Sequence, residues 1–120
     1  MEKLVTGIGG IFFRSKDNNT LALWYQEHFG INAVQNYKPW QTEAGPTVFA
    51  PFKNDTKYFG NMEQQFMINL RVSDLDKLYE QLKAAGVKLD ENRMNESYGK
   101  FAWAYDPEGN KIELWQPIGE

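Results

Sequence analysis

Few side chains in this sequence are of the types that carry out chemistry in active sites. Cysteine is absent and His28 is the only histidine, which excludes thiol nucleophiles, zinc ribbons and metal sites built on several histidines. Gly7, Gly9 and Gly10 precede a predicted strand, so they do not form the strand-to-helix loop of a dinucleotide site. The sequence also contains no phosphate-binding loop and no serine-nucleophile motif. No pair of a nucleophile and a base is visible in the sequence.

Glu113 is the carboxylate with the most distinctive surroundings. In a predicted hairpin of residues 101–105 and 111–115, it stands between Trp103 and Trp115 on one face. A carboxyl group flanked by indole rings can have a raised pKa and act as a general acid or base, or it can accept hydrogen bonds from a ligand. The alternative is a structural carboxylate that pairs with Lys111 or with an arginine. The residue types leave both interpretations open.

Arginine and aromatic side chains supply the candidate binding residues. Arg14 and Arg71 could clamp an anionic ligand through the planar guanidinium group, or each could pair with Asp17, Asp74 or a neighbouring glutamate. Aromatic residues make up 15% of the chain, which is more than a small core needs and indicates a lined pocket or an interface. Three tryptophans could form an aromatic cage for a ligand, or could serve as plain cavity lining or as a dimer contact: Trp40, Trp103 and Trp115.

Composition and charge narrow the class of protein. A chain of 120 residues is expected to form a single domain, residues 1–120. Its 13 basic and 16 acidic residues give a net charge of −3 without a basic stripe, which argues against nucleic acid and anionic membranes as partners. No apolar run approaches the roughly 20 residues of a membrane span, and no signal peptide is visible. We therefore expect a cytoplasmic protein without a membrane partner.

Two amphipathic helices are predicted from the spacing of large residues. Residues 17–19 supply N-cap side chains for the first, Gly30 ends it, and its stripe should pack in the core with His28 in a structural role. Ser73 and Asp76 form a weak capping box for the second, and Gly86 ends it. The two stripes are Leu21, Trp24, Tyr25, His28 and Phe29, and then Leu75, Leu78, Tyr79 and Leu82.

Short segments rich in β-prone residues surround these helices. The sequence Asp-Pro-Glu-Gly-Asn at residues 106–110 is typical of a type I turn followed by a left-handed glycine, which closes a hairpin with a G1 bulge. Residues 32–45 and 53–62 are predicted as short strands joined by loops. The better-defined strand predictions are residues 11–15, 47–52, 66–72, 101–105 and 111–115.

An internal repeat organises these elements. Residues 10–17 align with residues 67–74, and each half is predicted as one strand, one helix and about three further strands. The chain thus divides into two βαβββ modules, at about residues 1–60 and 61–120. Because neither half can bury its helix and sheet alone, the modules should pack edge to edge.

The paired modules and the closing sequence Asp-Pro-Glu-Gly-Asn-Lys-Ile-Glu-Leu, residues 106–114, resemble the vicinal oxygen chelate superfamily, the glyoxalase/bleomycin-resistance/dioxygenase group. The resemblance covers nearly the whole chain. It implies an α+β fold in which the two modules form a curved mixed sheet, a cup that holds the ligand, with the helices outside. Strand alternation then assigns these side chains to the cup: Phe12, Arg14, Thr47, Phe49, Met67, Asn69, Arg71, Phe101, Trp103, Glu113 and Trp115.

The resemblance also implies where a metal would bind. Metal enzymes of the superfamily place ligands at four strand positions, which transfer to Gly10, Thr47, Met67 and Glu113. A lyase or epimerase site of this kind takes His or Glu at all four positions, and the iron dioxygenases take two His and one carboxylate. Glycine has no ligand atom, threonine is a poor ligand and a thioether does not suit a hard divalent ion. We therefore expect neither a metal nor a cofactor in the cup.

The leading hypothesis is a small-molecule-binding protein of the glyoxalase/bleomycin-resistance type with a degenerate metal site, which binds a small aromatic or anionic ligand in an aromatic-lined cup. An alternative is a glyoxalase-like lyase, isomerase or dioxygenase that uses Glu113 as acid/base or metal ligand. A third is an interaction module whose aromatic residues serve only a dimer interface. Open sheet edges and surplus aromatics predict a homodimer, in which Phe52, Tyr58 or Phe59 contribute to the contact or roof the cup.

Overall fold

The computed structural model describes residues 2–29, 31–32 and 38–118. All strands within these residues belong to one mixed sheet, in the order β2-β3-β1-β4-β7-β6-β5. The fold is α+β, as the sequence predicts. Neither helix that the structure describes is long and apolar enough to span a bilayer. In chain order the elements are β1 (Val5–Ser15), α1 (Asn18–Phe29), β2 (Trp40–Thr42), β3 (Gly45–Lys53), β4 (Phe66–Val72), α2 (Leu75–Ala84), β5 (Lys88–Glu96), β6 (Gly99–Tyr105) and β7 (Lys111–Pro117).

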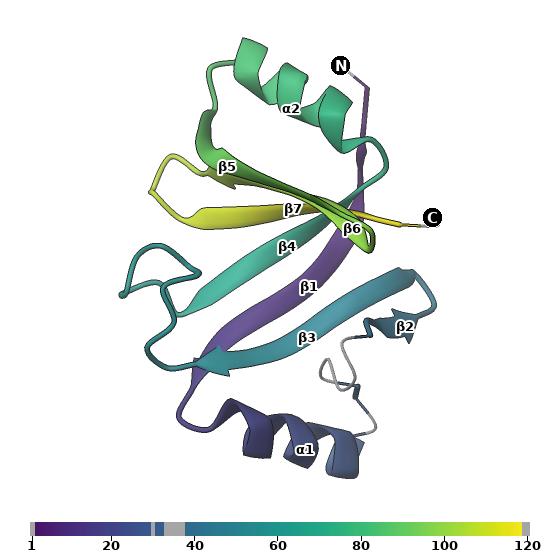
Figure 1. Ribbon diagram of the computed structural model, residues 1–120, viewed down its shortest axis with the longest axis vertical. Coiled ribbons are helices and arrows are strands. Elements are labelled where there is room, and N and C mark those ends of the chain that lie inside the picture. Colours follow the sequence, from purple (N-terminus) through teal and green to yellow (C-terminus); the bar gives the residue numbers. More distant parts are fainter. Residues whose placement is uncertain (1, 30, 33–37, 119–120) are drawn as a thin grey trace.

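The two sequence repeats meet through their first strands. β1 runs antiparallel to β4, with Ile11 opposite Ile68, so the two halves join edge to edge as the repeat predicts. Within each repeat, the first strand is parallel to the last, β1 to β3 and β4 to β7. In Figure 1 the helices α1 and α2 lie at opposite ends of the molecule, and β1 and β4 run between them. The middle of the sheet is therefore built from strands of both repeats.

Apolar side chains gather on both faces of the sheet. One cluster packs α2 against β4, β6 and β7, and it includes Leu75, Leu78, Ala102 and Leu114. The second cluster lies on the opposite face, because Trp103 alternates with Ala102 along β6. Its buried members are Phe12, Ala50, Phe59, Met67 and Trp103.

The ends of the helices follow the sequence with one difference. Asp17 Oδ1 accepts a hydrogen bond from the backbone N–H of Thr20 at 3.0 Å, which confirms a cap at residue 17. At α2 the N-cap is Asp74, whose Oδ1 accepts from Lys77 N at 3.1 Å, so the predicted capping box of Ser73 and Asp76 is wrong. Gly86 follows α2 with φ +78°, as predicted. Gly30 lies outside the described residues.

Helix α1 buries less of its stripe than predicted. Among the residues described in it, only Ala22 is buried, whereas Trp24 and Phe29 are 46% and 63% exposed. The helix contacts the sheet through Tyr25, whose ring centroid lies 5.0 Å from that of Phe49. Trp24 instead contacts the His28 ring along the helix, with centroids 4.9 Å apart and an interplanar angle of 50°. Tyr25 also contacts Phe13 of β1, with centroids 6.3 Å apart, so the helix meets the sheet through Tyr25 and the buried Ala22 while Trp24 and Phe29 stay exposed.

The β6–β7 hairpin has the predicted register. Trp103 lies opposite Glu113 and Phe101 opposite Trp115, so these four residues share one face. The turn is also as predicted, because Gly109 N donates to Asp106 O at 2.9 Å and Gly109 has φ +85°. The turn chemistry therefore fixes which residues of the hairpin face the cup.

Two other segments differ from the sequence prediction. Residues 54–65 contain turns and no strand, so the prediction of short strands at residues 53–62 is wrong beyond the end of β3. Within residues 32–45, the described part contains the short strand β2, and residues 33–37 lie outside the described residues. The segment of residues 54–65 connects the end of β3 to the start of β4 (Figure 1), and its residues Phe59 and Tyr58 join the second apolar cluster.

Candidate functional site

A cavity of about 490 Å³ opens on the concave face of the sheet. Phe12 of β1 and Phe52 of β3 line one side, and their ring centroids are 5.0 Å apart. Phe101 of β6 and Trp115 of β7 line the other side, with nearly parallel rings at an interplanar angle of 7°. The remaining lining residues are Pro39, Val48, Tyr58, Asn69, Tyr98 and Glu113. The cavity is thus a slot between aromatic walls, with few polar side chains.

A bulge in β1 brings two glycines against the polar part of this cavity. The pairing with β4 shifts between Ile8 and Gly10. A Cβ atom at Gly9 would lie 2.1 Å from Asn69 Oδ1, and one at Gly10 would lie 2.4 Å from the backbone oxygen of Val48. Any larger residue would displace these neighbours. The glycines therefore allow the strands to approach closely beside the cavity.

Glu113 is a buried carboxylate with one partnered and one unpartnered oxygen. Its side chain is 2% exposed, and Oε1 accepts a hydrogen bond from the Tyr58 hydroxyl at 2.9 Å. Oε2 has no hydrogen-bond partner within the described part of the chain. Burial raises the pKa of Glu113 to about 7, although the Tyr58 hydroxyl, the Asn69 side chain and the charge of Lys111 all oppose this rise. The group can therefore hold or release a proton near neutral pH.

Lys111 supports this arrangement without forming an ion pair with Glu113. Its Nζ donates to the backbone oxygen of Tyr58 at 2.9 Å and lies 5.4 Å from the ring centroids of Tyr58 and Trp103. Burial and the nearby Glu113 carboxylate raise the pKa of Tyr58 well above its ordinary value, so the hydroxyl stays a donor. Lys111 therefore acts on Glu113 through its charge, without the direct pairing that the sequence-based alternative predicts.

Arg14 holds the segment of residues 54–65 rather than a ligand. Its guanidinium group donates to the backbone oxygens of Gln64, Asn54, Thr56 and Asn61, at 3.0, 2.9, 2.8 and 3.2 Å. Because these bonds use the guanidinium group, Arg14 neither clamps an anion nor pairs with an acidic residue. Both sequence-based interpretations of Arg14 are therefore wrong.

Arg71 is committed to the backbone in the same way. It is 5% exposed, and its guanidinium group donates to the backbone oxygens of Pro46 at 2.7 Å, Ala44 at 2.8 Å and Ile8 at 3.3 Å. These bonds tie the β2–β3 turn to β1. The guanidinium group does not line the cavity and does not pair with Asp74.

Several predicted binding residues lie outside the cavity lining. Phe49 faces α1, because Val48 occupies the cup side of β3 at that point, so the assignment of Phe49 to the cup is wrong. Trp40 is half-buried in β2 opposite Thr47 and does not line the cavity. Met67 and Trp103 are on the predicted face but are buried beneath the lining, 0% and 4% exposed. The predicted residues that the structure brings together are Phe12, Asn69, Phe101, Glu113 and Trp115.

The strand pattern does not assign the other lining residues to the cup. Phe52 and Tyr58 are candidates from the sequence for a roof of the cup or for a dimer contact, and the structure places both on the cavity. Val48 follows once the face of β3 is corrected by one residue. Pro39 and Tyr98 come from chain segments outside the strands, and no periodic signal in the sequence points to them.

The sheet register also tests the metal positions. Gly10 pairs with Val48 on one side and with Asn69 on the other, and Asn69 pairs with Glu113. The row across β3, β1, β4 and β7 is therefore Val48, Gly10, Asn69 and Glu113. The predicted metal positions Thr47 and Met67 are wrong, and Val48 and Asn69 take their places. An aliphatic side chain, a glycine, an amide and one carboxylate do not fit a divalent metal. Across the described residues, no group of three or more His, Cys, Asp or Glu side chains could hold one.

The fold and the sequence pattern together define the family. The pattern of the Glyoxalase/Bleomycin resistance protein/Dioxygenase superfamily matches residues 7–114. The chain belongs to this superfamily. Among curated proteins, none matches this chain in sequence.

Solved structures show the same fold at low sequence identity. Methylmalonyl-CoA epimerase from Mycobacterium tuberculosis has a TM-score of 0.70 and 22% identity, covering 98% of this chain and 92% of that one. A variant of Streptomyces coelicolor methylmalonyl-CoA epimerase, in complex with 2-nitronate-propionyl-CoA, has a TM-score of 0.69 and 16% identity, covering 96% and 99%. A structure described as an NAD-dependent benzaldehyde dehydrogenase from Legionella pneumophila has a TM-score of 0.60 and 9% identity, covering 90% and 97%. At these identities the similarity establishes the fold alone.

Proposed function

We propose that the protein binds a small aromatic molecule in the concave cavity and acts by holding it, without a metal. The observation that carries this proposal is the cavity of about 490 Å³ between two aromatic walls. This volume lies within the range of roughly 300–1,000 Å³ that is usual for small-molecule sites. A flat ring that enters the slot would contact Phe12 and Phe52 on one side and Phe101 and Trp115 on the other.

The contacts of the two arginines favour an aromatic over an anionic ligand. Arg14 and Arg71 are the candidate anion-binding groups of the sequence, and both guanidinium groups are bonded to backbone oxygens. Lys111 Nζ is likewise bonded to a backbone oxygen. The ionisable group on the cavity lining with a raised pKa near neutrality is a carboxyl, Glu113, which would repel an anion when ionised.

An NMR titration with a library of aromatic fragments tests this proposal. We expect the indole N–H resonance of Trp115 to shift on binding, because Trp115 lines the cavity. The resonance of Trp24, which is 46% exposed on α1, serves as an internal control and should not move. A library in which no fragment shifts Trp115, or in which binders shift Trp24 alone, would contradict the proposal.

A second candidate function is metal-free proton transfer, and the specific observation that favours it is Glu113. Its carboxyl has a pKa raised to about 7 and an oxygen without a partner among the residues described. An enzyme of this kind would exchange a C–H proton next to a carbonyl group with solvent. Incubation of aromatic 2-oxo acids and thioesters in D₂O, followed by mass spectrometry, tests it. Deuterium incorporation should require Glu113 and disappear in Glu113→Gln.

We also propose that the protein is a homodimer. The support is a set of exposed apolar side chains on the outer face of β1 and β4, named here the central outer face: Ile8, Ile11, Phe66 and Ile68, which are 51%, 43%, 61% and 50% exposed. These four residues are apolar, with Glu63, Asp106 and Lys111 at their border, and they lie between α1 and α2, which cover the two ends of the sheet (Figure 1). Because β1 and β4 are equivalent strands of the repeat and run antiparallel, the face resembles itself after a half-turn. A second copy is therefore the partner whose surface matches it.

A further inference from the structure

We propose that the cavity selects an uncharged aromatic ligand whose polar group donates a hydrogen bond to Glu113 Oε2, a phenol being the simplest such ligand. This inference rests on the proposed function, because it requires that the cavity bind an aromatic molecule. It adds the chemistry of the polar group, its position in the cavity and the residue that recognises it.

The polar part of the cavity offers acceptors. Asn69 and Glu113 lie opposite each other on β4 and β7, and both line the cavity. They are 1% and 2% exposed. Neither Asn69 Oδ1 nor Glu113 Oε2 has a hydrogen-bond partner within the described residues. Buried acceptors without partners are uncommon in native proteins, so a donor from outside the chain is the expected partner.

No donor of the described residues meets hydrogen-bond geometry at Glu113 Oε2. The side chain of Asn69, opposite Glu113, lowers the pKa of the carboxyl, and the buried Nε1 of Trp103, also opposite Glu113, has no partner. The Tyr58 hydroxyl donates to Oε1, and Lys111 Nζ donates to the backbone oxygen of Tyr58. The indole of Trp115 turns its Cε3 edge towards Gly9, while its Nε1 lies beside Gly99 at the start of β6. Because Oε2 has no hydrogen-bond partner within the described residues, it is free to accept from a ligand, or from water before the ligand binds.

The charge of the lining decides between neutral and charged ligands. An anion would meet the Glu113 carboxyl, while Arg14 and Arg71 are held by backbone oxygens. A cation would have to give up its hydration in a slot whose walls are the rings of Phe12, Phe52, Phe101 and Trp115, with a single carboxyl to replace it. A neutral hydroxyl loses much less hydration and supplies the hydrogen bond that Oε2 can accept. The neutral donor is thus the ligand class that the lining accommodates best.

Four probes with the same 4-methylphenyl ring and different polar groups test the preference for the polar group of the ligand: 4-methylphenol, 4-methylanisole, 4-methylbenzoate and 4-methylbenzylammonium. Affinities are measured by NMR titration of the complete chain at pH 8. We expect 4-methylphenol to bind at least tenfold more tightly than 4-methylanisole, because a hydrogen bond to a carboxylate is worth about one order of magnitude in affinity or more. The benzoate and the ammonium compound should bind more weakly than the phenol.

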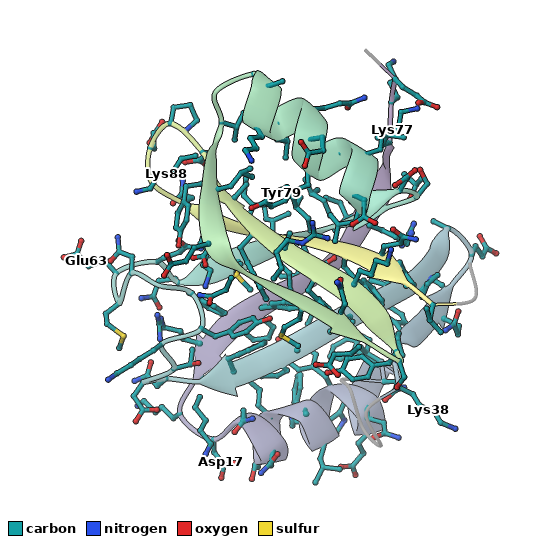
Figure 2. All side chains as sticks on the ribbon, turned by 45° about the horizontal axis from the view of Figure 1, so that its top comes forward. Asp17, Lys38, Glu63, Lys77, Tyr79 and Lys88 are labelled. Atoms are coloured by element: carbon teal, nitrogen blue, oxygen red, sulfur yellow. The ribbon has the colours of Figure 1, made fainter. Side chains whose placement is uncertain are left out.

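Two variants attribute the preference to Glu113. In Glu113→Leu the tenfold advantage of 4-methylphenol should disappear, and in Glu113→Gln it should shrink, while the affinity for 4-methylanisole stays within about twofold and reports an intact cavity. The matched control Glu63→Gln, at an exposed side chain that points away from the fold in Figure 2, should bind all four probes like the parent protein.

The outcomes separate this inference from the proposed function. Equal affinities for 4-methylphenol and 4-methylanisole would overturn the donor preference and leave aromatic binding intact. Tighter binding of the benzoate or the ammonium compound would overturn the neutral ligand class. If none of the probes binds, both this inference and the proposed function fail.

Discussion

At the scale of single residues, Glu113 combines a buried position with a charge that burial disfavours. Its folded pKa of about 7 is raised from the ordinary value of 4.5, chiefly by burial. When the pH is below 4.5, the carboxyl is protonated in both the folded and the unfolded chain, so its ionisation does not lower the free energy of unfolding. As the pH rises from 4.5 to 7, the unfolded chain releases the proton first, so the free energy of unfolding falls. Above pH 7 the loss is complete, at roughly 3 kcal/mol.

Glu113→Gln should remove this dependence on pH. The variant keeps the size of the side chain and the contact with Tyr58 but cannot ionise, so its free energy of unfolding should fall less between pH 4.5 and pH 7 than that of the parent. Urea unfolding at a series of pH values measures the difference. Glu63→Gln, at an exposed position, is the control and should follow the parent curve. A parent protein whose stability rises steadily from pH 4.5 to pH 7 by several kcal/mol would contradict the assignment.

Tyr58→Phe should act on the same carboxyl from the opposite direction. The Tyr58 hydroxyl lowers the pKa of Glu113 by donating to Oε1, so its removal should move that pKa above 7. The variant should lose about 1–3 kcal/mol of stability at pH 8, where the carboxylate is left unpaired, and much less at pH 5. NMR titration of the Glu113 carboxyl carbon and urea unfolding at both pH values provide the measurements.

Tyr98→Phe is the matched control for Tyr58→Phe, since Tyr98 also lines the cavity but is 61% exposed. It should leave the Glu113 titration unchanged. An unchanged Glu113 pKa in Tyr58→Phe would show that the hydroxyl contributes nothing to it.

The positions of single residues could be predicted from sequence where side chains alternate between the two faces of a strand. The hairpin turn fixed the faces of Phe101, Trp103, Glu113 and Trp115, because the pleat alternates strictly from a known turn. The roles of the arginines could not be predicted, since their guanidinium groups bond to backbone oxygens of residues distant in sequence, and such oxygens carry no residue-type signal. Tyr58 was recognisable as a roof candidate, but its bond to Glu113 spans 55 positions and has no local signature.

At the scale of elements, the segment of residues 54–65 has no helix or strand of its own, and it packs Tyr58 and Phe59 into the apolar cluster on the concave side. Arg14 fixes it through bonds to the backbone oxygens of four residues, and its guanidinium carbon lies 5.0 Å from the ring centroid of Phe59. Phe59 is completely buried. The position of Tyr58, and with it the closed side of the cavity, therefore depends on one arginine of β1.

Arg14→Lys should loosen this segment selectively. Lysine keeps the charge, but a single ammonium group cannot reach the backbone oxygens that the planar guanidinium group joins. We expect amide hydrogen exchange within residues 54–65 to accelerate at least tenfold, with a loss of about 2 kcal/mol in global stability. Arg93→Lys is the control, because Arg93 pairs with Asp76 at the surface. Unchanged exchange in residues 54–65 would contradict the role assigned to Arg14.

The row of residues across β3, β1, β4 and β7 also leads to a prediction about metal. Protein purified without chelator should contain far less than one Zn, Ni, Mn or Fe per chain, because Val48, Gly10 and Asn69 leave Glu113 as the single carboxylate of the row. Elemental analysis measures this. A content near one metal ion per chain that falls in Glu113→Gln would overturn the assignment of a degenerate site.

Helices and strands were predicted most accurately where the sequence has strict hydrophobic periodicity and clear end signals. β4 has the predicted bounds, and α2 has its predicted stripe in the core, because both have strict periodicity and clear ends. The faces of β3 were assigned one residue out, because the sequence places Thr47 on the cup, whereas the parallel register pairs Gly10 with Val48. The stripe of α1 was overestimated because large residues at helical spacing do not reveal which of them the sheet will contact.

At the scale of the whole molecule, the two repeats are related by a pseudo-twofold axis between β1 and β4, and the outer side of these strands is exposed. The helices pack on the two ends of the sheet, and the outer sides of β1 and β4 between them keep Ile8, Ile11, Phe66 and Ile68 largely exposed. Apolar residues of this size on adjacent strands at the centre of a sheet normally have a covering layer. Phe52, Tyr58 and Phe59, the aromatic residues considered for a dimer contact, instead lie on the cavity side, so the central outer face takes their place in the proposed dimer.

The dimer should dissociate when charge is placed on the central outer face. Light scattering across micromolar concentrations should give a mass near twice the 13.9 kDa of one chain for the parent protein. Ile68→Lys should shift the mass towards that of a monomer, because in a twofold interface one substitution introduces two like charges close to the axis. Val87→Lys, at a position 36% exposed beyond the end of α2, is the control and should remain dimeric. Since the cavity opens on the other face of the sheet, the Ile68→Lys monomer should still bind 4-methylphenol. A parent protein whose mass stays at 13.9 kDa at all concentrations would show that no second copy binds the central outer face.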